Sequence, residues 1–342
     1  MKLILHTFKL LTRKVFTTSH GSAAFRRCLV VELQHEGCSG YGEATEILYY
    51  GKNLEEMIQR VKASQDWIES TTITDPFVKY KEWYQRFHQD RFVLCAIDTA
   101  YHDLYGKLNN SSLIDLWNLK RGVNPISSLT VGIDTIDNMI EHIHQNPWPV
   151  YKIKLGTPHD MEIMKAIRRI TDNPLRVDVN EGWTAQQTIP YSHELKSLNI
   201  EYIEQPLPAA NHMEMPEIFK NSALPVFADE SCHIPEDVIT CSNYFHGINI
   251  KLMKCGGLTP ALDMIGQART LGLKIMIGCM TETSIGISAL GQILPLVDYA
   301  DMDGSLLISN DPASGVYLDQ GQAIYPEEKG TGARLIHQNP IS

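Results

Sequence analysis

Residues 150–254 contain five short apolar segments that each run into charged residues: VYKIKLG (150–156), LRVDVN (175–180), IEYIEQP (200–206), PVFADES (225–231) and GINIKLMK (247–254). Lys152 to Asp178 and Asp178 to Glu204 are each 26 positions apart, Glu204 to Asp229 is 25 and Asp229 to Lys251 is 22. This period fits one β-strand, one helix and two loops. The rhythm predicts a parallel barrel, in which the carboxyl ends of all strands open onto one face. Charged residues far apart in the sequence should therefore meet at one site.

The composition is that of a water-soluble globular protein. With 342 residues, 43% of them hydrophobic and 20% charged, the chain can form one barrel of about 250 residues or fewer plus a smaller unit. It has no run of 18 apolar residues, and polar residues interrupt its N-terminus as they would not in a signal peptide. The net charge of −10 argues against nucleic acid or an anionic membrane as a partner. The seven cysteines are scattered without a close pair, so reduced thiols and a cytoplasmic location are expected.

The first 120 residues predict an α+β unit. Three β-rich runs, 3–10, 27–34 and 38–45, predict an antiparallel sheet, and the small, polar residues between 12 and 27 are interpreted as a mobile loop. Helices are expected from Asn53 to about 68, over 79–90 and over 91–107. The polar, turn-rich stretch 107–125 is interpreted as the passage between two domains.

The barrel is expected over residues 125–311. Its first strand is SLTVGID (128–134), followed by a helix from Thr135 or Asp137 to about Gln145. KIMIGCM (274–280) and YADMDG (299–304) are the seventh and eighth strands. The tail, about 312–342, has too few apolar residues to form a core and is expected to pack on the first unit.

Three carboxylates end consecutive strands of this pattern, namely Asp178, Glu204 and Asp229. Three oxygen ligands without histidine or cysteine suit a hard cation, and Mg²⁺ is the natural candidate. Alternatively, each acid pairs with a nearby lysine. Three acids buried together would be costly without a cation, which favours the metal site.

Lysines supply the second half of the predicted chemistry. Lys152 and Lys154 are two residues apart and so point to the same side of a strand, and Lys251 lies across the barrel. A neighbouring divalent cation should lower the pKa of such a lysine and make it usable as a base. A base on each side of one carbon could remove its proton from one face and return it on the other, with the cation stabilising the enediolate. For the Lys-Ile-Lys stretch alone, a solvated edge strand is the simpler interpretation.

These motifs carry a family resemblance. In order and spacing, YKIKLG, DVNEGW, EQPL, ADES, NIKLMKCGG and MTETSIG resemble the muconate-lactonising subgroup of the enolase superfamily, most closely the dipeptide epimerases. GYGEAT and CAIDTAYHDLYGKL extend the resemblance through the first 120 residues. The resemblance implies a modified (β/α)7β TIM-type barrel (125–311) with an N-terminal α+β capping domain (1–120) that the tail completes. It also implies a Mg²⁺-dependent epimerase that inverts the second residue of an L-Ala-Xaa-type dipeptide by two-base proton transfer, and a homo-oligomer is expected.

The resemblance assigns roles by position. It implies Mg²⁺ ligands at Asp178, Glu204 and Asp229, acid/base lysines at Lys154 and Lys251, and a contact from Lys152 to the substrate carboxylate. The other implied positions are Asn180, Glu230 and Lys254 behind the ligands, with Lys254 paired to Glu230, and Thr130, Cys279 and Glu282 at the pocket.

Two features concern the substrate. Asp301 and Asp303 alternate on the last strand and match the pair that receives the α-ammonium in dipeptide epimerases; a solvated strand end is the alternative. Where relatives specific for L-Ala-D/L-Glu can carry an arginine that holds the glutamate side chain, this chain has Gly21, and Arg26 and Arg27 are interpreted as the start of a strand. A dipeptide with a small, apolar or differently anchored second residue therefore fits as well. The loops near 16–27 and 45–53 are expected to close over the pocket and set this preference.

Other functions use the same scaffold. An N-acylamino acid racemase, an o-succinylbenzoate synthase or a cycloisomerase could use the same lysines without needing the aspartate pair. A barrel that has lost catalysis is disfavoured, because every metal and lysine position is intact. His142 and His144 lie in a helical run with no strand end beside them, so they are not interpreted as zinc ligands.

Overall fold

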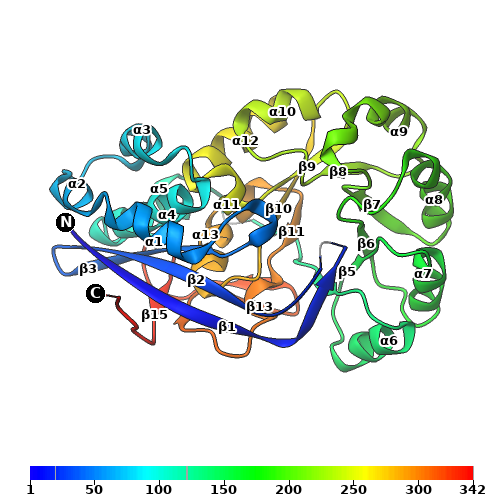
Figure 1. Ribbon diagram of the computed structural model, residues 1–342, viewed down its shortest axis with the longest axis horizontal. Coiled ribbons are helices and arrows are strands. Elements are labelled where there is room, and N and C mark those ends of the chain that lie inside the picture. The colour runs from blue at the N-terminus through cyan, green and yellow to red at the C-terminus, as the bar shows by residue number, and fades with distance from the viewer. Residues whose placement is uncertain (20, 121, 342) are drawn as a thin grey trace.

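The central element of the computed structural model, which describes residues 1–19, 21–120 and 122–341, is a parallel sheet of eight strands in the order β11-β10-β9-β8-β7-β6-β5-β4. It curls into a barrel (Figure 1). A parallel bridge between Ser127 and Ala300 joins its two edges. The strands are β4 Leu129–Val131, β5 Tyr151–Lys154, β6 Leu175–Asp178, β7 Ile200–Glu204, β8 Val226–Ala228, β9 Gly247–Ile250, β10 Lys274–Gly278 and β11 Tyr299–Asp301.

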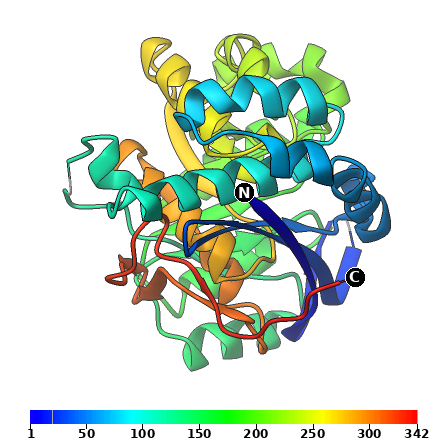
Figure 2. The ribbon, with the colours of Figure 1, turned by 90° about the vertical axis from the view of Figure 1, so that its left-hand side faces the viewer.

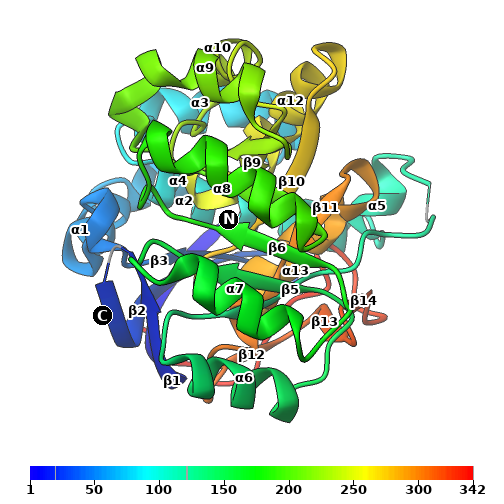
Figure 3. The ribbon, with the colours of Figure 1, turned by 90° about the vertical axis from the view of Figure 1, so that its right-hand side faces the viewer.

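Helices follow the strands and cover the outside of the sheet, as Figure 3 shows for α7 and α8. In the described part of the chain the last strand, β11, is followed by a short 3₁₀ turn, η4 (Asp303–Ser305), instead of a helix, which confirms the predicted (β/α)7β pattern. The first of these helices begins at Ile136, within the predicted start, and the hydroxyl of Thr135 caps it by accepting from Asn138 N. The helices are α6 Ile136–Gln145, α7 Asp160–Arg168, α8 Ala185–Ser197, α9 Met215–Asn221, α10 Pro235–Cys241, α12 Leu258–Thr270 and α13 Ser284–Ile293, with α11 Leu252–Cys255, η2 Ala209–Glu214 and η3 Leu294–Leu296 between them.

The N-terminal part is a three-stranded antiparallel sheet packed on a buried helix. The sheet has the order β1-β2-β3 (Lys2–Thr18, Gly21–His35, Cys38–Thr45), and α4 (Arg91–Leu108) crosses it. Gly40 and Gly42 allow this contact, because a Cβ on Gly42 would lie 1.9 Å from the carbonyl oxygen of Ala96. The sheet and helix 91–107 are thus confirmed.

Two helix predictions need correction. The helix expected from Asn53 to 68 is two helices, α1 (Leu54–Lys62) and α2 (Gln65–Ser70); Asn53 caps the first as predicted, by accepting from the Glu56 amide. The helix expected over 79–90 is α3 (Pro76–Phe87), which begins earlier because Asp75 caps it and proline favours the first helical turn.

The segment 12–27 was expected to be a mobile loop, but its described residues, 12–19 and 21–27, form the distal half of the β1-β2 hairpin, with a register shift between 11 and 16. Residue 20 lies outside the described residues. The hairpin reaches the barrel mouth, where Thr17 O accepts from Ile133 N (3.0 Å) and Ser19 Oγ donates to Asn180 O (2.5 Å). These contacts between distant residues order a stretch whose composition is typical of loops.

The chain ends return to the N-terminal part. The connection 107–125 holds the short helix α5 (Leu113–Leu116), and η1 (Leu48–Tyr50) follows β3.

The tail contains β12 Ala313–Ser314, β13 Tyr317–Asp319, β14 Gln322–Ile324 and β15 Arg334–Leu335. It runs beside β1 (Figure 2), and Ile341 N donates to Leu5 O at 2.9 Å. Of the helices in the described ranges, none combines the length and apolar character of a bilayer crossing.

Candidate active site

Three buried carboxylates converge at the carboxyl ends of neighbouring strands. Asp178 ends β6, Glu204 ends β7 beside it in the ladder, and Asp229 directly follows β8. One oxygen of each lies within 4.8 Å of the others, and all three residues are fully buried. The predicted convergence of strand ends therefore brings the three acids together.

The acid triad Asp178–Glu204–Asp229 fits a hard divalent cation. Its donors are carboxylate oxygens, the ligands that Mg²⁺ prefers. Glu204 Oε1 accepts from Asn249 Nδ2 (2.7 Å), but Glu204 Oε2 has no hydrogen bond of acceptable geometry within the described structure, although Lys152 Nζ lies 2.7 Å away. Burial, and next the charge of Asp178, raise the pKa of Glu204 to about 8. An under-coordinated oxygen among crowded acids is what a cation would stabilise.

Four buried lysines surround the acids. Lys152 Nζ lies 3.0 Å from Asp178 and 2.7 Å from Asp301, and Lys154 Nζ donates to Asp178 Oδ2 at 2.6 Å. Lys251 Nζ donates to Asp229 Oδ2 at 2.8 Å.

Lys254 corrects one expectation. Its Nζ bonds to Asp229 Oδ1 and to the Asp229 carbonyl, both at 2.5 Å, rather than to Glu230. It follows Lys251 by less than one turn of α11, so both ammonium groups reach the same acid. Lys254 therefore stabilises a ligand candidate directly.

The charges of the cluster shift the pKa values of Asp178 and Lys251 in opposite directions, and both shifts favour the charged forms. Burial would raise the pKa of Asp178, but Lys152 and Lys154 hold it well below its usual range. Burial would lower the pKa of Lys251, but the Asp229 carboxylate raises it well above its usual value. The sequence led us to expect a lowered pKa for a lysine base. That shift requires a cation bound between the acids, whose positive charge would offset theirs.

The aspartate pair lies at the seam where the sheet closes. Asp301 ends β11 and accepts from Lys152 Nζ and Ser128 Oγ, both at 2.7 Å. Asp303 does not continue the strand, as the sequence suggested, but begins η4. Its Oδ2 accepts a hydrogen bond from the backbone amide of Thr130 in β4 at 2.6 Å. The turn still brings Asp303 into the same cavity as Asp301.

A cavity of about 130 Å³ opens above the acids. It brings together Lys154 and Lys251, which come from strands on opposite sides of the barrel, with Asp301, Asp303 and Cys279. Thr130, Asn180 and Glu230 line it too. Lys152 and the acid triad lie beneath it.

Glu282 is the exception among the expected pocket residues. Its Oε1 accepts from Met280 N (2.8 Å), and the residue is buried between the barrel and Glu43 of β3. Burial, and next the charge of Glu43, raise the pKa of Glu282 well above its usual range. It supports the loop after β10 instead of lining the cavity.

The N-terminal part supplies the other wall, from the segments near 16–27 and 45–53 that were expected to close over the pocket, although the individual residues were not identified from the sequence. Arg26, Ile47, Tyr49 and Tyr50 line the cavity, and Tyr49 OH donates to Glu181 of the barrel at 2.6 Å. Only long-range docking places these residues. Asn249, which holds Glu204, was also missed, but its position two residues before Lys251 on one strand could have identified it.

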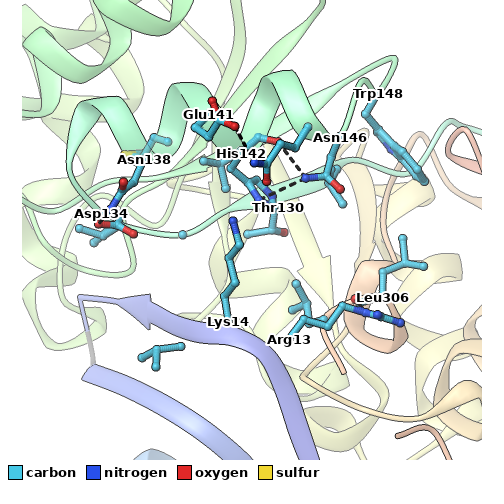
Figure 4. A pocket seen from close by; sticks show the side chains of 18 of the residues that line it. Arg13, Lys14, Thr130, Asp134, Asn138, Glu141, His142, Asn146, Trp148 and Leu306 are labelled. Atoms are coloured by element: carbon cyan, nitrogen blue, oxygen red, sulfur yellow. Dashed lines mark hydrogen bonds between the residues drawn. The ribbon is translucent and has the colours of Figure 1, made fainter. Parts of the chain in front are cut away.

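A larger groove of about 980 Å³ adjoins this cavity and shares Thr130 and Leu307 with it. It lies between β1 and α6, and Figure 4 shows Lys14 pointing across it toward His142. The acid triad and the lysine pair belong to the smaller cavity, so the groove is not the centre of the chemistry. His142 is half-buried and His144 is exposed, which agrees with their interpretation as ordinary helix residues.

A parallel barrel with acids and lysines at the ends of successive strands is typical of metal-dependent barrel enzymes, and sequence comparison identifies the family. Residues 136–338 match the family model of enolase C-terminal domain-like proteins. The chain belongs to the enolase superfamily, within the group of dipeptide epimerase-like proteins.

Individual relatives match over nearly the whole chain. An "L-Ala-D/L-amino acid epimerase" of Flavobacterium johnsoniae is 47% identical over 336 residues, covering 98% of this chain and 100% of the relative. An "L-Ala-D/L-Glu epimerase" of Bacteroides thetaiotaomicron is 37% identical, covering 98% and 88%. The crystal structure of the Enterococcus faecalis dipeptide epimerase, complexed with Mg and the dipeptide L-Leu-L-Tyr, superimposes with a TM-score of 0.89 at 27% identity, covering 97% and 98%.

Proposed function

We propose that this protein is a Mg²⁺-dependent dipeptide epimerase that inverts the α-carbon of the second residue of an L-Ala-Xaa-type dipeptide. The observation that carries the proposal is the placement of Lys154 and Lys251, from β5 and after β9, on one small cavity above three buried carboxylates. The named activities of the relatives support it.

Asp178, Glu204 and Asp229 would hold the cation. When bound, Mg²⁺ supplies positive charge that lowers the pKa of the lysines and stabilises the oxygens of the enediolate. Lys152 adds a buried ammonium group beneath the cavity, next to Asp178 and Glu204. Lys254 and Asn249 keep Asp229 and Glu204 in position through the hydrogen bonds described above.

The two lysines act on opposite faces of the substrate α-carbon. The neutral amine of one takes the α-proton, and the C–H electron pair moves into the carboxylate to give the enediolate. The ammonium group of the other then donates a proton to the opposite face. The lysines exchange protonation states in one turnover, so exchange with solvent must restore them. Asn180 Oδ1 accepts from Lys154 Nζ at 3.1 Å and orients that amine.

The substrate α-ammonium is assigned to Asp301 and Asp303. Both face the cavity at the seam, and Thr130 fixes Asp303. This pair separates dipeptides from N-acylated amino acids, whose acyl group carries no positive charge to pair there. Thr130 and Cys279 shape the same side.

Deuterium exchange tests this function. With Mg²⁺ and an L-Ala-L-Xaa library in D₂O, mass spectrometry should show one deuterium at the second residue. N-acetyl amino acids should exchange far more slowly. Rapid exchange of N-acetyl amino acids, with none for any dipeptide, would replace the epimerase with a racemase of N-acylated substrates.

We also propose that the chain divides into a capping domain (1–120, completed by about 312–342) and a catalytic barrel (125–311). The described cysteines are free thiols, most of them buried, which supports a reducing, cytoplasmic location. A homo-oligomer is expected, and light scattering tests it.

A further inference from the structure

The guanidinium group of Arg26 is unusual among the charged groups of the cavity. Arg26 lies in the middle of β2, and its side chain lines the cavity from the capping side. Its Nε is shielded from solvent and has no hydrogen-bond partner among the described residues. Burial lowers the pKa of Arg26 and the charge of Glu46 partly offsets this, but no described carboxylate lies within ion-pair distance of the guanidinium.

Glu46, the carboxylate whose charge acts on Arg26, is already held by the neighbouring arginine. Arg27 holds Glu46 through Nε (2.9 Å) and Nη2 (2.5 Å), and also binds Glu55. The amide of Leu54 donates to the same Glu46 side chain at 3.1 Å. Arg26 thus brings to the cavity a guanidinium group that feels the charge of Glu46 but forms no ion pair with a described carboxylate.

The position of Arg26 restricts what it can meet. In the proposed reaction, which this inference assumes, the substrate carboxylate would be held at the cation that the acid triad binds, and the α-ammonium at Asp301 and Asp303. The remaining group on the α-carbon is the side chain of the second residue, and it can extend toward the capping side. There the cavity wall consists of Thr18, Gly21, Arg26, Ile47, Tyr49 and Tyr50, in which Arg26 is the one cation among the described residues.

We propose that Arg26 is a specificity residue that selects dipeptides whose second residue carries a side-chain carboxylate, glutamate in particular. A guanidinium can donate two parallel hydrogen bonds to a carboxylate, and such charge-assisted bonds are the stronger ones. Ile47 and Tyr50 shield the pair from water, which strengthens it. Arg26 would therefore anchor an acidic side chain in this cavity, although Gly21 stands where relatives can carry an arginine.

The test compares L-Ala-L-Glu with its neutral isostere L-Ala-L-Gln. In the parent enzyme, kcat/KM should favour the glutamate dipeptide. Arg26→Gln should reduce the ratio of the two kcat/KM values by about 10- to 100-fold, as expected for the loss of a charge-assisted hydrogen bond. Arg27→Gln is the matched control, because Arg27 is adjacent in sequence but pairs with Glu46 and Glu55; its ratio should stay within about threefold of the parent's.

Charge reversal gives a second, independent measurement. Arg26→Glu should turn the preference from L-Ala-L-Glu toward L-Ala-L-Lys, a gain that a damaged fold could not produce. Equal ratios in the parent and Arg26→Gln, with both dipeptides turned over, would overturn the role of Arg26 while leaving the epimerase intact. No α-proton exchange with either dipeptide in the parent would instead remove the proposed function, and this inference with it.

Discussion

Replacing Lys251 or Lys154 by methionine tests the two-base mechanism most directly. Each lysine is expected to carry one of the two proton transfers, and a positioned acid or base contributes about 10²- to 10⁴-fold. Epimerisation needs both, so each variant should lose at least about 10²-fold in the rate of inversion. The same variant should still bind the dipeptide through the groups that the substitution leaves in place.

The structure limits the damage that these substitutions can do to the fold. Without Lys251, Asp229 keeps Lys254 at 2.5 Å, and without Lys154, Asp178 keeps Lys152 at 3.0 Å. No buried acid is left without a cation, so the loss of about 3–5 kcal/mol that follows breaking a buried pair should not occur. The cost should be that of one charged hydrogen bond, about 1.5–3 kcal/mol.

The assay follows the α-proton of each diastereomer separately. In D₂O with Mg²⁺, ¹H NMR records the loss of the α-proton signal of L-Ala-L-Glu and of L-Ala-D-Glu. A variant with a single base should exchange the proton of one diastereomer without inverting it, and the two variants should act on opposite diastereomers. Lys165→Met is the control, because Lys165 pairs with Glu194 on the outer helices.

One result would refute the reasoning. If Lys154→Met and Lys251→Met both invert the dipeptide at rates within tenfold of the parent, neither lysine is an obligatory base. Circular dichroism of each variant must show an intact fold for the comparison to count. Loss of inversion with exchange retained for one diastereomer would support one base on each face.

Three other predictions concern the metal, pH and packing. Mg²⁺ at about 100 times its Kd should stabilise the parent by about 2.7 kcal/mol, raising Tm by about 4 °C for a chain of this length, and Glu204→Gln should abolish most of this shift in a thermal scan. Burial raises the pKa of Asp98 to about 7, so the stability it contributes is full below about pH 4 and is lost as pH rises toward 7; Asp98→Asn should flatten this slope in urea titrations at pH 5 and 8. Gly42→Ala should lower the unfolding free energy by about 1–3 kcal/mol, because the new Cβ would meet the Ala96 carbonyl of α4, whereas Gly37→Ala, with open space around it, should show only the strain of its positive φ.

The barrel and its acids could be predicted because one local rule fixes them. In a strand, alternate side chains point to the same face, so Lys152 and Lys154 must enter the barrel together. The ends of parallel strands also meet on one face, which placed Asp178, Glu204 and Asp229 side by side. Neither inference needs knowledge of distant contacts.

The residues that were misplaced lie where that rule stops. Asp303 follows a strand of three residues, and its direction depends on the turn that comes next. Lys254 reaches Asp229 because α11 begins directly after Lys251, which a strand-based pattern does not show. Glu282 bonds to the amide of Met280 and is buried close enough to Glu43 of the capping sheet, 239 positions away, for the charge of that acid to raise its pKa.

The capping side illustrates the larger limit. The segment 12–27 was interpreted as a loop because its residues are small and polar, yet residues 12–19 and 21–27 belong to a hairpin. Thr17 O accepts a hydrogen bond from Ile133 of the barrel, and Ser19 Oγ donates one to Asn180 O. This docking decides that Arg26 meets the cavity while Arg27 meets Glu46. The bases sit on barrel strands whose geometry the sequence period fixes, whereas the side-chain selector sits on a hairpin positioned by contacts more than 100 residues apart. Reaction class and substrate preference are therefore encoded in separate parts of the chain, and a substitution on the hairpin can change the second without touching the first.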